Sequence, residues 1–104
     1  MNRQQQDALR VLGYFYLQHQ QPDKARVLFR ALLTLTPDDN YALRALGYAC
    51  LKAGHYRDAL TAIDRIDSDD ALTRLIRSQA HWALGEKEQA RTYFEDYLQM
   101  QTRR

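Results

Sequence analysis

The sequence predicts an all-α fold, an α-solenoid of three tandem helical hairpins with about six antiparallel helices. Three observations predict it: a segment that recurs after 34 residues, apolar residues that recur every three or four positions, and glycines or prolines at the ends of the periodic segments. No alternating apolar–polar run bounded by turns indicates a β-strand. At 104 residues, the chain has the length of a single domain.

Periodicity and turn residues place the helices at about 4–19, 22–35, 40–53, 56–66, 71–84 and 87–101. Pro22 suits the first turn of the second helix, where a missing N–H leaves no hydrogen bond unmade, and Pro37 follows the end of that helix. Gly54 and Gly85 follow the third and fifth helices, where a C-terminal cap needs a residue that tolerates left-handed backbone angles. The connecting loops are short, which makes successive helices antiparallel neighbours.

The repeat is strongest between residues 8–17 and 42–51, where ALRVLGYFYL and ALRALGYACL agree at seven of ten positions. A period of 34 is that of the tetratricopeptide repeat, whose skeleton is a large residue, Leu-Gly and Tyr, followed by Ala-x3-Phe and Pro. The first unit supplies Leu9, Leu12-Gly13, Tyr16, Ala25, Phe29 and Pro37, and the second supplies Leu43, Leu46-Gly47, Cys50, Ala59 and Ile63. The chain therefore resembles tetratricopeptide proteins, in which the small residues let two helix backbones approach closely.

A third unit is shorter and more polar than the first two. Aligning Ala59 with Ala90 gives a spacing of 31, so about three residues are missing near 67–70. Arg74, Arg77 and Ser78 stand where the motif has apolar residues and glycine, so we expect altered packing there. The expected repeats are about 6–39, 40–70 and 71–104, all within one domain spanning 1–104.

Composition excludes several classes of function. The net charge is +2 with both signs interspersed, and only the Arg103-Arg104 pair hints at a basic cluster, which argues against a nucleic-acid surface. No run approaches the roughly 18–20 apolar residues of a membrane span, so we expect a cytoplasmic protein. The single cysteine, Cys50, excludes an internal disulfide and a cysteine-based zinc site, and its place in the repeat predicts a packed thiol.

No pattern of reactive side chains predicts an enzyme, a cofactor or a metal site. His19 and His55 are expected to end the first helices of the first two hairpins, near the turns, and His81 to lie in mid-helix; none has a histidine or glutamate three or four residues later. The acidic segment 64–70 lacks the glycine and closing glutamate of a calcium loop, so we interpret Asp69 or Asp70 as the N-cap of the fifth helix.

The first helices of the three hairpins predict a partner-binding groove. In arrays of this type they line a concave surface, and the groove-facing positions carry tyrosine, tryptophan, leucine and arginine, the residue types of binding hot spots. Some of these side chains could instead pack only against neighbouring helices. The predicted groove residues are Arg10, Tyr14 and Leu17 with Asp7 and Gln18, then Tyr41, Arg44, Tyr48 and Leu51 with Lys52, then Leu75, Gln79 and Trp82 with Leu72 and Ala83.

The predicted ligand is an apolar helix or extended segment. A groove that binds a terminal carboxylate needs several basic and asparagine side chains. The only asparagine near the predicted groove is Asn40, which stands at a helix start, so a carboxylate ligand is disfavoured. A rival prediction is a scaffold that self-associates through its terminal helices, with Tyr93, Phe94 and Tyr97 as the interface.

The chain also resembles the small chaperones of bacterial type III secretion, and is most similar to the YscY (SctY) chaperones. The resemblance rests on the tetratricopeptide units, a sequence that starts directly in the first helix, and the segment ALLTLTP at 31–37 that closes the first hairpin. It implies a cytosolic protein that forms a heterodimer with the secreted subunit YscX (SctX) and contacts the export-gate protein. The translocator chaperones of the SycD type, which have an extra N-terminal helix, and the needle-protein cochaperone YscG are similar alternatives.

Overall fold

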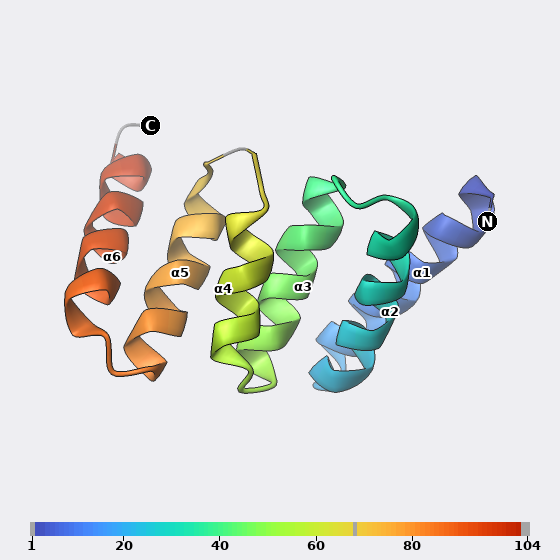
Figure 1. Cartoon of the computed structure of the whole chain (residues 1–104), viewed down its shortest axis with the longest axis horizontal. Helices are drawn as coiled ribbons and strands as arrows, with labels where there is room; N and C mark the ends of the chain where they lie inside the picture. Colours follow the sequence, from blue (N-terminus) through green and yellow to red (C-terminus); the bar gives the residue numbers. More distant parts are fainter. Residues whose placement is uncertain (1, 68, 103–104) are drawn as a thin grey trace.

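Six α-helices make up the part of the chain that the structure describes (Figure 1). The computed structural model describes residues 2–67 and 69–102. The helices are α1 (Arg3–Gln18), α2 (Pro22–Leu35), α3 (Asn40–Lys52), α4 (Tyr56–Asp64), α5 (Ala71–Ala83) and α6 (Lys87–Thr102). The predicted all-α fold is confirmed, and each predicted helix end lies within two residues of the observed one.

The helices form three hairpins, α1–α2, α3–α4 and α5–α6, which follow one another along the longest axis of the molecule (Figure 1). The first helices contact one another, α1 with α3 and α3 with α5. Each second helix contacts the first helix of the next hairpin, α2 with α3 and α4 with α5. Helix α3 therefore has neighbours on both sides, and seven of its residues are buried.

Within the first two hairpins, a glycine on the first helix lies directly under a large side chain of the second. A Cβ atom at Gly13 would lie 2.5 Å from Phe29 Cζ, and one at Gly47 would lie 2.7 Å from Ile63 Cδ1. Phe29 and Ile63 are fully buried in these positions. Any larger residue at either glycine would displace a core side chain, which confirms the interpretation of these small residues.

The third hairpin closes differently, because Ser78 occupies the position of Gly13 and Gly47. Its hydroxyl donates a buried hydrogen bond of 2.9 Å to the Ala90 carbonyl. The serine side chain therefore occupies the space that, in the first two hairpins, is filled by Phe29 or Ile63 of the second helix. Phe94, which corresponds to Phe29, is accordingly 43% exposed, whereas Phe29 is completely buried.

The other polar residues of α5 find partners on the neighbouring elements. The Arg77 guanidinium lies 3.2 Å from Asp64 and 5.5 Å from the centre of the Tyr93 ring, so it bridges α4 and α6. Arg74 makes two hydrogen bonds to Asp69, at 3.0 and 2.6 Å. The first helix of the third hairpin is therefore packed through these ion pairs together with the buried Ile76 and Ala80.

The helix ends follow the predicted signals, with two corrections. Pro22 is the first residue of α2, Gly54 and Gly85 have positive φ angles, and Asp70 is the N-cap of α5. His55 caps the start of α4 rather than ending α3, because α3 stops at Lys52. His81 lies in the last turn of α5 rather than in mid-helix, since α5 ends at Ala83.

One turn departs from the glycine rule. Gln20, which follows α1 as Gly54 follows α3, has a φ of 59°. A residue with a Cβ atom is strained by roughly 1–2 kcal/mol in this conformation. We expect Gln20→Gly to raise the free energy of unfolding by about 0.5–1 kcal/mol, because glycine relieves the strain but costs some chain entropy.

Gly54→Gln is the matched reverse change, and should lower stability by a similar amount. A Cβ atom at Gly54 has no neighbour within 4 Å, so no clash complicates the comparison. Urea unfolding followed by circular dichroism measures both changes. Effects of the same sign in the two variants would contradict this account of the turns.

Gly13→Ala should destabilise the protein by about 1–2 kcal/mol, although alanine favours helices by up to about 1 kcal/mol over glycine. The cause is the 2.5 Å approach to the buried Phe29 ring. The double variant Gly13→Ala/Phe29→Leu makes room for the new methyl group. Its total cost should be smaller than the sum of the two single costs in the same urea titrations; simple additivity would show that the ring does not limit this position.

Candidate protein-binding groove

A groove of about 550 Å³ runs across the first helices of the three hairpins. Its lining combines aromatic, aliphatic and amide side chains: Tyr14, Leu17, Gln18, Gln20, Tyr41, Arg44, Ala45, Tyr48 and Leu72. These residues come from α1 and the turn after it, from α3, and from the start of α5. The stacking of first helices that the fold imposes therefore brings together residues up to 58 positions apart, from Tyr14 to Leu72.

The groove exposes large apolar side chains on an ordered support. Tyr14, Tyr41 and Leu72 are all exposed to solvent. The Tyr41 ring meets the buried Phe29 ring edge to face, with centres 6.4 Å apart. The Lys52 ammonium lies 5.4 Å from the centre of the Tyr48 ring. Both tyrosines are thus held by neighbours before any ligand arrives, which lowers the entropic cost of binding.

The arginines at this surface already have intramolecular partners. Arg10 makes an ion pair with Asp39, and Arg44 makes one with Asp70 at 2.6 Å. Asp39 is the N-cap of α3 and Asp70 that of α5. Each arginine therefore ties the first helix of one hairpin to the start of the next hairpin. We call this repeated pair the arginine–aspartate ladder.

The ladder changes the acidity of its second aspartate. Burial tends to raise the pKa of Asp70, but hydrogen bonds from the Thr73 backbone and hydroxyl, with the Arg44 guanidinium, outweigh it and hold that pKa below its ordinary value. A carboxyl whose pKa is lower in the folded state stabilises the fold above its unfolded pKa of about 3.9. That contribution is lost as the pH falls through the folded pKa.

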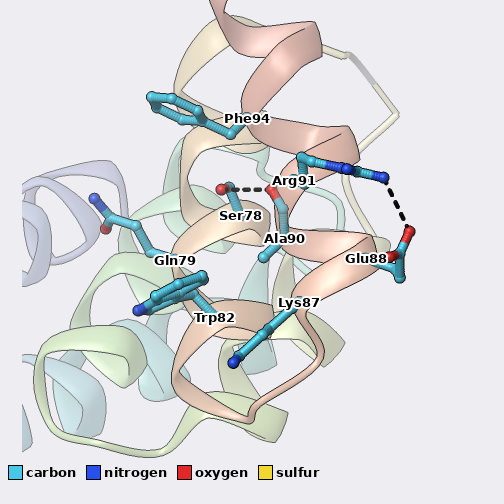
Figure 2. Close-up of a pocket in the computed structure, with 8 residues that line it drawn as sticks. All are labelled: Ser78, Gln79, Trp82, Lys87, Glu88, Ala90, Arg91 and Phe94. Carbon is cyan, nitrogen blue, oxygen red and sulfur yellow. Dashed lines mark hydrogen bonds and ion pairs between the residues drawn. The ribbon is translucent and has the colours of Figure 1, made fainter.

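The other predicted groove residues lie elsewhere. Arg10 lies at the ladder and not in the groove lining, and Leu51 is buried in the core. Leu75 and Tyr97 line a shallow hollow next to the groove, and Arg44 and Leu72 line both. Gln79 and Trp82 line a separate hollow between α5 and α6 (Figure 2). The continuous stripe predicted from Tyr14 to Trp82 is therefore divided between the groove and the end of the array.

Sequence reasoning missed two residues of the groove lining, Gln20 and Ala45. Ala45 faces the groove, although Val11, the equivalent residue of the first hairpin, does not line it. Gln20 follows α1 in a turn where the other hairpins have glycine. The absence of glycine at that turn was the one signal in the sequence that set Gln20 apart.

The remaining reactive side chains are engaged in packing. Burial raises the pKa of the Cys50 thiol, although the nearby Arg26 guanidinium works against this, so the thiol is held protonated. His81 Nδ1 lies 2.9 Å from Glu86, and its ring stacks on Tyr93. Among residues 2–67 and 69–102, no cluster of three or more His, Cys, Asp or Glu side chains is arranged to hold a metal ion. Within the same residues, no helix is both long and apolar enough to cross a membrane.

Replacing Asp70 by Asn should flatten the acid dependence of stability. Asparagine caps helices as well as aspartate does, so the change removes the charge and spares the cap. At neutral pH we expect a cost of about 0.5–1 kcal/mol from the weakened pair with Arg44. Between pH 5 and about pH 2.5, the variant should lose less stability than the parent. Asp38→Asn is the control: Asp38 is exposed and precedes the other ladder aspartate, and its replacement should leave the dependence of stability on pH unchanged. If Asp70→Asn and the parent had the same dependence on pH, the role assigned to Asp70 would be refuted.

Comparison with known proteins agrees with the geometry. Two family models described as tetratricopeptide repeat match the chain, one over residues 16–78 and the other over residues 73–103. No curated protein matches it. Tetratricopeptide repeats are protein-interaction motifs that are generally not enzymes, and solenoids of this kind present extended concave surfaces to their partners. The matched residues cover most of the sequence and contain the whole groove except Tyr14, and the chain belongs to the tetratricopeptide repeat family.

Proposed function

We propose that the groove holds an apolar segment of a partner protein, and that the chain is a chaperone for that partner. The observation that carries the proposal is the composition of the groove. Tyr14, Tyr41 and Leu72 are exposed there, whereas the Arg44 guanidinium is engaged by Asp70. An acidic ligand would have to compete with that aspartate, while an apolar one gains from the rings and leaves the ladder intact.

The partner we propose is a secreted subunit of a bacterial type III secretion system, of the SctX type. The chaperone would shield an apolar or helical segment of this subunit in the cytoplasm, as a heterodimer, and help to deliver it to the export gate. Support comes from the resemblance to YscY (SctY) chaperones and from a groove suited to an apolar segment. Chaperones of needle subunits or translocators are alternatives of the same class, and a general tetratricopeptide scaffold is an alternative outside it.

Helix-in-groove binding would explain why three first helices contribute to one surface. An amphipathic helix presents apolar side chains every three or four residues, and a hydrophobic groove receives them as anchors. Tyr14 and Leu72 lie at opposite ends of the lining, on α1 and α5, with the α3 side chains between them. The proposed segment crosses all three hairpins and contacts each of them.

The double variant Tyr14→Ala/Leu72→Ala tests the proposal. Co-expressed with a SctX-type subunit, it should bind at least about tenfold more weakly than the parent, because two exposed anchors are removed. Affinities are measured by calorimetry on the purified complexes, and helicity by circular dichroism. Val11→Ala is the matched control: Val11 is exposed on α1 but does not line the groove, so its affinity should equal that of the parent.

Two results would contradict the proposal. Undiminished affinity of the double variant, with its helicity intact, would move the binding site away from the groove. No binding of the parent to SctX-type, needle or translocator subunits would remove the secretion role. In that second case, the groove could still be tested with an amphipathic apolar peptide, which the double variant should bind more weakly than the parent.

A further inference from the structure

Both ends of the array expose apolar side chains that interior hairpins bury. Here the first hairpin exposes Val11, Leu12 and Phe15, and the last exposes Trp82, Phe94 and Leu98. These six side chains lie outside the groove lining, so the proposed groove ligand does not account for them.

Four exposed residues of α1 lie at helical spacing and form a face that we call the N-face: Ala8, Val11, Leu12 and Phe15. Their equivalents on α3, 34 residues later, include Ala42, Leu46 and Ala49, all buried. Val11 is 68% exposed; its equivalent on α5, Ile76, is only 1% exposed, whereas its equivalent on α3, Ala45, is half-buried and faces the groove. Since α3 and α5 each contact the preceding hairpin, the N-face is the surface with which a first helix packs on the hairpin before it.

At the other end, α5 and α6 form a second face, the C-face, made of Gln79, Trp82, Arg91, Phe94 and Leu98. Trp82 is 66% exposed, while its equivalent in the second hairpin, Leu51, is buried. Leu98 corresponds to Leu33 of the first hairpin, which is buried, and to Asp67 after α4, which is exposed. Phe94 corresponds to Ile63, which is buried over Gly47 of its own hairpin. The C-face is thus the surface that, inside the array, receives the first helix of the next hairpin.

The C-face is hollowed. A depression of about 500 Å³ lies between α5 and α6, with Ser78 and Ala90 between Trp82 and Phe94 (Figure 2). It exists because Ser78 keeps the Phe94 ring out of the position that Phe29 and Ile63 fill in the other hairpins. An apolar side chain from outside can enter this depression between the two rings.

Charge also matches between the two faces. The four N-face residues carry no charge. On the C-face, Arg91 pairs with Glu88 at 3.1 Å and with Glu95 at 3.9 Å, all on α6. The next step of the ladder is absent from the C-face, because Leu75 stands where Arg10 and Arg44 stand in the other hairpins. Arg91 therefore keeps its own partners on α6 when the faces meet; Lys87 also lines the depression.

We propose that the N-face of one copy of this chain packs on the C-face of a second copy, as α5 packs on α4 within the chain. The interface continues the interior junctions in the same register and uses both exposed ends at once. Helix α1, with 16 residues, is about 24 Å long. A contact one helix wide lies near the lower limit for specific interfaces, roughly 1,000 Å² in total, so the association is weak and depends on concentration.

The contact joins different faces, so each added copy leaves one face free and stacks can grow. Val11→Glu and Trp82→Glu place a charge in one face each, at positions already exposed in the monomer. Sedimentation velocity from about 1 to 300 µM should show the parent growing in mass with concentration, and each variant remaining monomeric. An equimolar mixture of the two variants should form a dimer and stop there, because one intact N-face then meets one intact C-face.

Val27→Glu is the matched control. Val27 is 67% exposed, as Val11 is, but its interior equivalent Thr61 is exposed as well, so the position lies outside the seam. This variant should associate like the parent. The groove variant Tyr14→Ala/Leu72→Ala should also stack normally, so a failure of the proposed function leaves this inference standing, and the reverse holds too.

Three results would overturn the inference. A parent that stays monomeric at about 300 µM excludes stacking. If Val11→Glu lost association while Trp82→Glu still associated like the parent, the contact would be a two-fold one between N-faces. Failure of the mixed variants to dimerise, with helicity unchanged by circular dichroism, would show that the two faces do not meet.

Discussion

The contact of a glycine backbone with a large buried side chain sets the geometry of the first two hairpins. Phe29 lies over Gly13 and Ile63 over Gly47, with no room for a Cβ atom at either glycine. This contact fixes how closely the two helices of a hairpin approach, and therefore how the outer faces of each hairpin are turned. The first two hairpins repeat this contact, and their first helices α1 and α3 form most of the groove; α5 adds Leu72 although its own hairpin lacks the contact.

The arginine–aspartate ladder links one hairpin to the next. Arg10 reaches Asp39 and Arg44 reaches Asp70, so the same aspartates both cap helices and bind guanidinium groups. The ladder holds the start of α3 against α1 and the start of α5 against α3. In the proposed function, the ladder engages Arg10 and Arg44, so that rings and aliphatic side chains make up the surface offered to an apolar segment.

The third hairpin shows what happens when the glycine contact is lost. Ser78 stands where the other hairpins have glycine, and its hydroxyl donates a hydrogen bond to the Ala90 carbonyl. Phe94, the residue that would lie over a glycine at this position, is exposed at the surface. Arg77 then joins α4 to α6 through Asp64 and Tyr93 in place of apolar packing. The same substitution that departs from the repeat therefore creates the hollow, partly aromatic C-face at the end of the array.

The sequence by itself determined the six helices, the glycine contacts and the caps, because these depend on local spacing, on the 34-residue period and on backbone preferences of single residues. It also named seven residues of the groove lining: Tyr14, Leu17, Gln18, Tyr41, Arg44, Tyr48 and Leu72. Only the tertiary structure decided that Leu51 is buried, that Arg10 and Arg44 bind aspartates 29 and 26 residues away, and that Trp82 belongs to the end face. Those outcomes depend on how one hairpin is rotated against the next, which the shortened link before α5 and Ser78 change in ways that a repeat pattern does not encode.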